Sequence, residues 1–259
     1  GILRMSFEFN RSNIDHYLYL VAKEYKKANR ANPEAEIIIV GGASMIMNYN
    51  FRDTTTDIDS IIRAASSMKE VINRVGDEND LGDGWLNDDF KNTSSYSHKL
   101  IECSHFYKKF CNCLSVRTVS DEYLLAMKVR SARSYKNDLS DIVGIIKEHQ
   151  EMDRTLNFQI LNEAYKSLYG EDIHSDIADK IKSIFASDDL EDLFYSIKKE
   201  EQANKIAALE AEEIYGRTVN EDNVEKFIEH FRPSEEKVKL KTEADNQEFT
   251  NSLHRKRGR

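Results

Sequence analysis

Apolar and polar positions follow two different periods along this chain. Short runs rich in β-branched residues, bounded by glycine or polar residues, predict strands in the first half. These strands are expected at residues 37–40, 54–62, 98–103 and 112–119. Elsewhere apolar residues recur every three to four positions, the period of an amphipathic helix. Helices are expected in this half at residues 12–31, 43–50, 66–79, 120–132 and 139–147. The first of them is expected to begin with a capping box formed by Ser12 and Asp15.

The second half of the sequence continues with helical periodicity alone. An apolar stripe from Leu156 ends at Gly170, and further helices are expected at residues 177–185, 190–199, 204–215 and 222–231. Mixed elements followed by helices predict an α+β fold, with a mixed sheet flanked by helices and then a helical bundle. The predicted domains are residues 1–150, residues 151–232 and a flexible charged tail at residues 233–259. The basic end of this tail would either contact RNA phosphates or an acidic partner, or simply be solvated.

One stretch carries most of the candidate chemistry. Gly41 and Gly42 follow the first strand directly, where the backbone must turn tightly or approach a ligand. The next strand carries Asp57 and Asp59, which an alternating strand places on one face with Cα atoms roughly 6.5 to 7 Å apart. Ile58 would then face the core. Two neighbouring carboxylates repel each other unless a divalent metal holds them, although an acidic solvent-facing strand would look the same.

The helix at residues 120–132 contributes a candidate cation. Lys128 lies on the margin of its apolar stripe, so its ammonium group needs a partner. The available partners are a carboxylate, Asp138 or Asp141, and the triphosphate of a bound nucleotide; we predict the triphosphate. Asp138 also suits the N-cap of the following helix. Arg130 points away from the stripe and is expected to be solvated.

Taken together, these motifs resemble a known superfamily. The order strand, Gly-Gly, short helix and Asp-x-Asp strand is similar to that of polymerase-β-like nucleotidyltransferases. The segment W-L-N-D from Trp85 and the segment from Leu124 to Ile142 resemble the AbiEii-type branch of abortive-infection and toxin–antitoxin systems. No P-loop and no dinucleotide-binding glycine motif is present in the sequence. Trp85 itself is expected to be a core or interface anchor rather than a base-stacking residue.

The resemblance implies a set of site residues. Nucleotide would be bound by Gly41, Gly42, Ser44 and Lys128, and metal by Asp57 and Asp59. The catalytic residues would be Asp57, Asp59, Lys128, Asp138 and Asp141, with the choice between the last two left open. Many superfamily members add a third strand carboxylate. Here only Glu102 is placed for that role, because residues 114–118 contain no acid.

The resemblance also implies an activity. The protein would be a nucleotidyltransferase that uses Mg²⁺, or Mn²⁺ in its place, and transfers a nucleotide from an NTP. The acceptor would be a tRNA 3′ end or a protein hydroxyl, and a cognate antitoxin would be a partner. The alternative is a catalytically degenerate module that binds nucleotide and acts by interaction alone, since no third strand carboxylate is evident.

Composition narrows this interpretation only slightly. The chain of 259 residues has a formal net charge of −9, which argues against a general nucleic-acid coat but permits a local basic surface. Charged residues make up 32% and the mean hydropathy is −0.63, and neither a membrane span nor a signal peptide is expected. The three cysteines fit no disulfide framework, which predicts a reducing, cytoplasmic location. Zinc binding by Cys103, His105, Cys111 and Cys113 is disfavoured by their spacing.

Overall fold

A computed structural model of the chain describes residues 7–232. Within that range the helices are α1 (Arg11–Ala28), α2 (Gly41–Asn48), α3 (Met68–Glu78), α4 (Leu100–Cys103), α5 (Asp121–Ser131), α6 (Asp138–Glu151), α7 (Phe158–Tyr169), α8 (Ser175–Phe185), α9 (Leu190–Tyr215) and α10 (Val224–Phe231). Two 3₁₀ turns, η1 (Asp89–Asn92) and η2 (Gly216–Thr218), accompany them. The strands are β1 (Ala35–Ile39), β2 (Ile58–Arg63), β3 (Leu86–Asn87), β4 (His105–Phe110) and β5 (Leu114–Thr118). The predicted tail at residues 233–259 lies outside the described residues.

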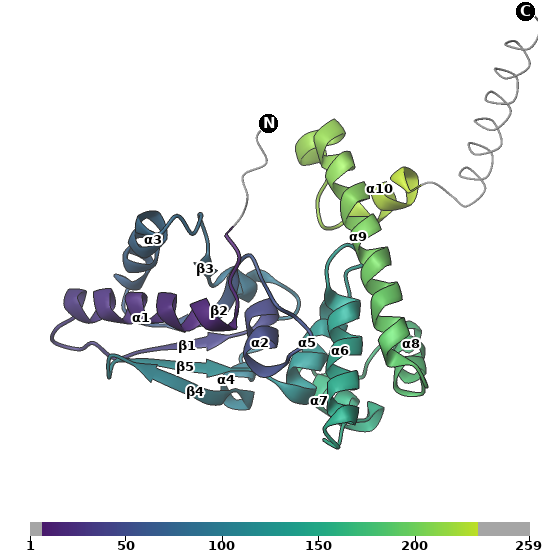
Figure 1. Ribbon diagram of the computed structural model, residues 1–259, viewed down its shortest axis with the longest axis horizontal. Helices are drawn as coiled ribbons and strands as arrows, with labels where there is room; N and C mark the ends of the chain where they lie inside the picture. Colours follow the sequence, from purple (N-terminus) through teal and green to yellow (C-terminus); the bar gives the residue numbers. More distant parts are fainter. Residues whose placement is uncertain (1–6, 233–259) are drawn as a thin grey trace, which may run out of the picture. The chain divides into compact units, whose positions relative to one another are not determined.

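The strands form one mixed sheet in the order β3-β2-β1-β5-β4 (Figure 1). The central strand β1 pairs antiparallel with β2 and parallel with β5, while β4 is antiparallel to β5 and β3 is parallel to β2. Helix α1 runs along one face of this sheet with α3 beside it (Figure 1). The predicted α+β architecture, a mixed sheet flanked by helices with helices alone after it, is confirmed.

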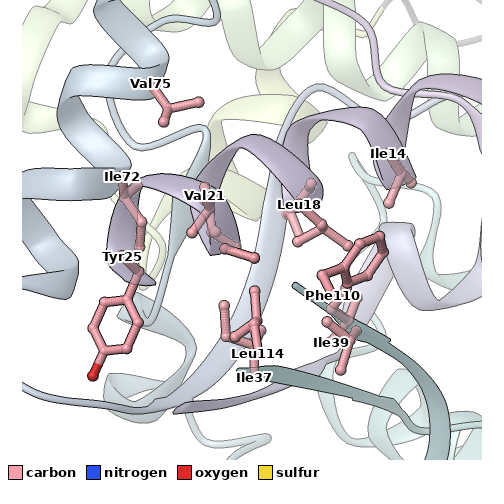
Figure 2. Packing of buried hydrophobic residues seen from close by; sticks show 14 of the residues in the cluster. Ile14, Leu18, Val21, Tyr25, Ile37, Ile39, Ile72, Val75, Phe110 and Leu114 are labelled. Carbon is pink, nitrogen blue, oxygen red and sulfur yellow. The ribbon is translucent and has the colours of Figure 1, made fainter. Parts of the chain in front are cut away.

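The main core fills the space between the sheet and these two helices. Figure 2 shows Ile14, Leu18 and Val21 of α1 facing Ile37 of β1 and Leu114 of β5. The predicted inward face of α3 is confirmed, because Met68, Val71, Ile72 and Val75 are all buried. Ile58 joins the same core, as its alternation with Asp57 and Asp59 predicted. Burial of such side chains stabilises the fold by roughly 1.5 to 3 kcal/mol each.

Trp85 anchors the strand that follows α3. Its side chain is 2% exposed, stacks on the Phe9 ring and donates from Nε1 to the Ile72 carbonyl at 2.9 Å. The following residue, Leu86, pairs with Ile58 across the parallel strands β3 and β2. The prediction of a core anchor is therefore confirmed. The W-L-N-D segment also forms β3, which pairs with the strand that carries Asp59.

Several predicted boundaries are wrong. The first helix is capped by Asn10, which forms a capping box with Asn13, so Ser12 and Asp15 do not cap it. The predicted strand at residues 98–103 is instead the short helix α4 with its preceding turn, and the edge strand β4 begins two residues later. The segments 190–199 and 204–215 belong to one continuous helix, α9.

By contacts between Cα atoms the chain divides into two units. Among the described residues, one comprises 7–133 and 138–195, and the other comprises 134–137 and 196–232. In the second unit, a small apolar cluster joins Ala207 and Ala208 of α9 to Val224 and Ile228 of α10. All of the candidate site residues lie in the first unit. The predicted division after residue 150 stays a prediction.

Candidate active site

The glycine pair lies at the end of the central strand, where α2 begins. Val40 takes the N-cap position in an extended conformation, and Gly41 follows with φ +61°, a left-handed value that suits glycine. Because β1 and β2 are antiparallel, the end of β1 adjoins the start of β2, and the Val40 amide donates to the Asp59 carbonyl at 2.9 Å. A Cβ atom at Gly41 would lie 3.0 Å from Asp59 Oδ2. The turn and the acidic strand are thus in direct contact.

Gly42 is enclosed by a different pair of side chains. A Cβ atom there would lie 2.7 Å from Thr55 Oγ1 and 2.7 Å from Arg52 Nη2. Thr55 is itself fixed, since its backbone pairs with Phe9 and its hydroxyl donates to the Asp57 carbonyl at 3.2 Å. The helix α2 therefore includes both glycines, two residues earlier than the predicted start at Ala43.

Gly42→Ala is expected to reduce both stability and nucleotide binding. The new methyl group meets the hydroxyl of Thr55, a buried residue whose backbone is held by Phe9, and displaces the Arg52 guanidinium; overpacking of this kind typically costs about 1 to 3 kcal/mol. Gly76→Ala is the matched control, because a Cβ atom there crowds the Trp85 ring at 2.7 Å, far along the chain from the glycine pair. Melting curves with and without Mg-NTP would separate the two effects. Equal nucleotide affinity in folded Gly42→Ala and wild type would show that Gly42 serves only the turn.

The two aspartates flank the first residue of β2. Asp57 precedes the strand and is exposed, whereas Asp59 lies within it and is partly buried. The predicted strand start at Thr54 is wrong: residues 54–57 form a loop joined to the rest of the fold by the Phe9–Thr55 bridge. The carboxylates are thus attached to a loop end and a strand end beside the glycine turn.

Ser44 is fully buried on α2. Its hydroxyl donates to the Val119 carbonyl, which ties the helix to the end of β5, and Asn48 donates from Nδ2 to the Ser44 carbonyl at 2.8 Å. The contact keeps α2 in position over the sheet. A role of Ser44 in nucleotide binding stays a prediction.

Lys128 lies among carboxylates near the end of α5. Its Nζ is 3.1 Å from Asp138 Oδ1 and 2.9 Å from Asp141 Oδ2, and all three side chains are buried. Both acids come from the first turn of α6, so the sequence alternatives Asp138 and Asp141 are both partners of the lysine. Arg133 adds a second cation, with Nε 2.8 Å from Asp138 Oδ2.

The electrostatics of this group favour its charged form. Burial by itself would lower the pKa of Lys128, but the charges of Asp141 and Asp138 outweigh it, and the pKa is raised above its usual value. Burial would likewise raise the pKa of Asp138, but Lys128 and Arg133 hold it well below the usual range. Neutral pH therefore leaves both groups ionised.

Arg52 connects this buried group to the glycine pair. Its Nη1 is 2.8 Å from Asp141 Oδ2, while its Nη2 lies against Gly42. The structure thus joins Lys128, Asp138 and Asp141 to the Gly-Gly turn through a residue that the sequence analysis did not single out. The available signal was a lone arginine five residues ahead of Asp57, between Phe51 and the small polar residues 53–57.

Two other sequence expectations need correction. Glu102 lies on α4 and not on a strand, so it cannot be the third strand carboxylate. On β5, the residue that pairs with Ile39 at the end of β1 is Thr118, which is not an acid. Arg130 is not simply solvated, because it donates to the Tyr165 hydroxyl at 3.0 Å and pairs with Glu171. Within residues 7–232 no group of three or more His, Cys, Asp or Glu side chains is placed to hold a metal ion.

The sheet order, the glycine turn and the acidic strand define the α+β fold of a nucleotidyltransferase. The family described as "Nucleotidyltransferase of unknown function (DUF6036)" matches residues 16–185, well over half of the sequence. The chain therefore belongs to this family. No curated protein and no solved structure matches the sequence. No helix within the part of the chain that the structure describes combines the length and the apolar character needed to cross a membrane.

Proposed function

We propose that this protein is a metal-dependent nucleotidyltransferase that uses an NTP. The observation that carries the proposal is the contact between the Gly41 turn and the Asp59 carboxylate, at 3.0 Å from the Cβ position. An acceptor hydroxyl would attack the α-phosphorus, and the bond from that phosphorus to the pyrophosphate oxygen would break. Backbone groups of the glycine turn would approach the phosphates, because Gly41 and Gly42 carry no side chains of their own.

The donor set suits Mg²⁺, with Mn²⁺ as a substitute. Asp57 and Asp59 provide carboxylate oxygens, and Mg²⁺ is commonly held by one or two carboxylates together with substrate phosphates rather than by a complete protein cage. When bound, the metal would neutralise phosphate charge and lower the pKa of the attacking hydroxyl.

For the acceptor and the biological role we propose a tRNA 3′ end or a protein hydroxyl, in an AbiEii-type toxin with a cognate antitoxin. This finer assignment is supported by the W-L-N-D segment at Trp85 and by the Lys128–Asp141 segment. A degenerate nucleotide-binding module is the second candidate. It is favoured by one observation, that Thr118 rather than an acid lies opposite Ile39 at the end of β5.

Transfer of label from NTP tests the two candidates directly. Each of the four NTPs, radiolabelled at the α-phosphate, would be incubated with the protein and Mg²⁺ in the presence of total tRNA or a cell lysate. An enzyme gives label in RNA or protein that depends on the metal and is lost with EDTA. Nucleotide-induced thermal stabilisation with no label in either acceptor pool would instead favour the binding module.

A further inference from the structure

Arg52 has a position that a structural ion pair alone does not require. It lies in the loop between α2 and β2, and its guanidinium contacts the backbone of Gly42: a Cβ atom there would lie 2.7 Å from Nη2 and 3.0 Å from Cζ. Only glycine permits this approach. The cation therefore lies against the second residue of the helix whose first residue contacts Asp59.

The hydrogen bonds of Arg52 use only part of its donor set. Nε donates to the Thr54 carbonyl at 3.2 Å and Nη1 donates to Asp141 at 2.8 Å. Among residues 7–232, Nη2 makes no hydrogen bond, and the side chain remains 16% exposed. A guanidinium has five N–H donors in a planar fork, so the edge beside Gly42 retains donors for an incoming anion.

The loop that carries Arg52 is fixed along one face of α6. Asp141, Gly144 and Glu148 are three and four residues apart, which places them in one row. Asp141 pairs with Arg52, and the Phe51 ring lies 2.5 Å from the Cβ position of Gly144. The Asn50 amide donates to Glu148 at 2.9 Å. The guanidinium is thus held in place without a ligand.

Arg52 does not have its carboxylate partner to itself. Asp141 is shared by two cations, Arg52 and Lys128, and Lys128 also pairs with Asp138. Arg52 and Lys128 even share one oxygen, Asp141 Oδ2. Lys128 is the more deeply buried of the two cations on that oxygen, so Arg52 is the one that an incoming anion reaches more readily.

We propose that Arg52 binds the polyphosphate chain of the NTP at Gly42, and that Lys128 acts through Asp141 to position it. This assignment rests on the proposed nucleotidyl transfer and names the cation of that site. A bidentate guanidinium suits phosphate oxygens, and charge-assisted hydrogen bonds of this kind contribute roughly tenfold to a hundredfold in affinity. The Asp59 carboxylate lies at the preceding residue, Gly41, where a metal would meet the same polyphosphate.

The test uses inorganic tripolyphosphate with Mg²⁺, because this probe does not depend on the identity of the base. Its dissociation constant would be measured by calorimetry on the wild-type chain, Arg52→Gln, Arg52→Lys and Arg130→Gln. Arg130→Gln is the matched control: it also removes a partly buried, ion-paired arginine, but one held by Tyr165 and Glu171. We expect affinity to fall between about tenfold and a hundredfold in Arg52→Gln, less in Arg52→Lys, and to be unchanged in Arg130→Gln.

Two results would overturn the assignment. Wild-type affinity for tripolyphosphate in either folded Arg52 variant would show that the arginine only supports the loop. The proposed nucleotidyl transfer is judged separately, by label transfer with the wild-type protein, and would not be affected by that result. Equal losses in Arg52→Gln and Arg130→Gln would show a general effect of destabilisation. If Arg52→Gln does not fold, Arg52→Lys decides, because it keeps a cation for Asp141 and lacks the free edge at Gly42.

Discussion

Replacing Asp59 with asparagine is expected to abolish nucleotidyl transfer. The carboxylate lies beside the Gly41 turn on a strand end, and in the proposed reaction it holds the metal that meets the phosphates. Asparagine keeps the size of the side chain, so the contact with Gly41 remains while the negative charge is lost. We expect the rate of label transfer to fall by at least about a thousandfold, since electrostatic stabilisation of a phosphoryl-transfer transition state is usually the largest contribution.

The matched control for this prediction is Asp53→Asn. Asp53 is an exposed acid in the same loop, four residues ahead of Asp57, so its loss changes the net charge equally. Circular dichroism and melting curves would confirm that both variants fold. Full transfer by the double variant Asp57→Asn and Asp59→Asn would rule out a metal site at this strand and with it the proposed activity.

Replacing Lys128 with methionine is expected to destabilise the protein strongly. The sequence left two kinds of partner open for this lysine, and we predicted the triphosphate; in the structure Asp138 and Asp141 already lie within 3.1 Å and 2.9 Å of Nζ. Methionine fills a similar volume but leaves the two buried acids without this cation. Removing one partner of a buried ion pair typically costs 3 to 5 kcal/mol, or on the order of 10 °C in melting temperature for a domain of this size.

Lys147→Met provides the comparison. Lys147 pairs with Glu151 on the exposed side of α6, and loss of such a surface pair changes the free energy of unfolding by less than about 1 kcal/mol. Urea unfolding of the two variants and the wild type would measure the difference. A Lys128→Met protein with wild-type stability but no affinity for Mg-tripolyphosphate would contradict this prediction and show that Lys128 itself binds phosphate.

Local sequence patterns were sufficient to predict which residues are buried wherever the periodicity of a single helix or strand decides it. The β-branched run at residues 37–40 predicted a buried strand, and the spacing of Met68, Val71, Ile72 and Val75 predicted the inner face of α3. The position of Ile58 in the core follows from strand alternation in the same way. In each case the side-chain period of the element alone decides which residues face inward.

Local patterns failed where short segments fit more than one structure. Residues 98–103 hold few apolar positions, too few to separate a strand from a helical turn, and contacts with the rest of the fold made residues 100–103 a helix. The first helix begins at Arg11, because Asn10 and Asn13 form the capping box there. Asparagine side chains cap a helix N-terminus as well as the predicted Ser12 would.

The sequence by itself determined the strands β1 and β5, the glycine turn and the presence of the acid pair at the next strand, because each is encoded in a few consecutive residues. The tertiary structure decided what Lys128 contacts and where Arg52 lies. Arg52 is separated from Asp141 by 89 positions in the chain, yet their side chains meet at 2.8 Å. No periodicity encodes such a contact; it arises when α6 packs against the loop after α2, and burial then requires each charge to find an opposite one.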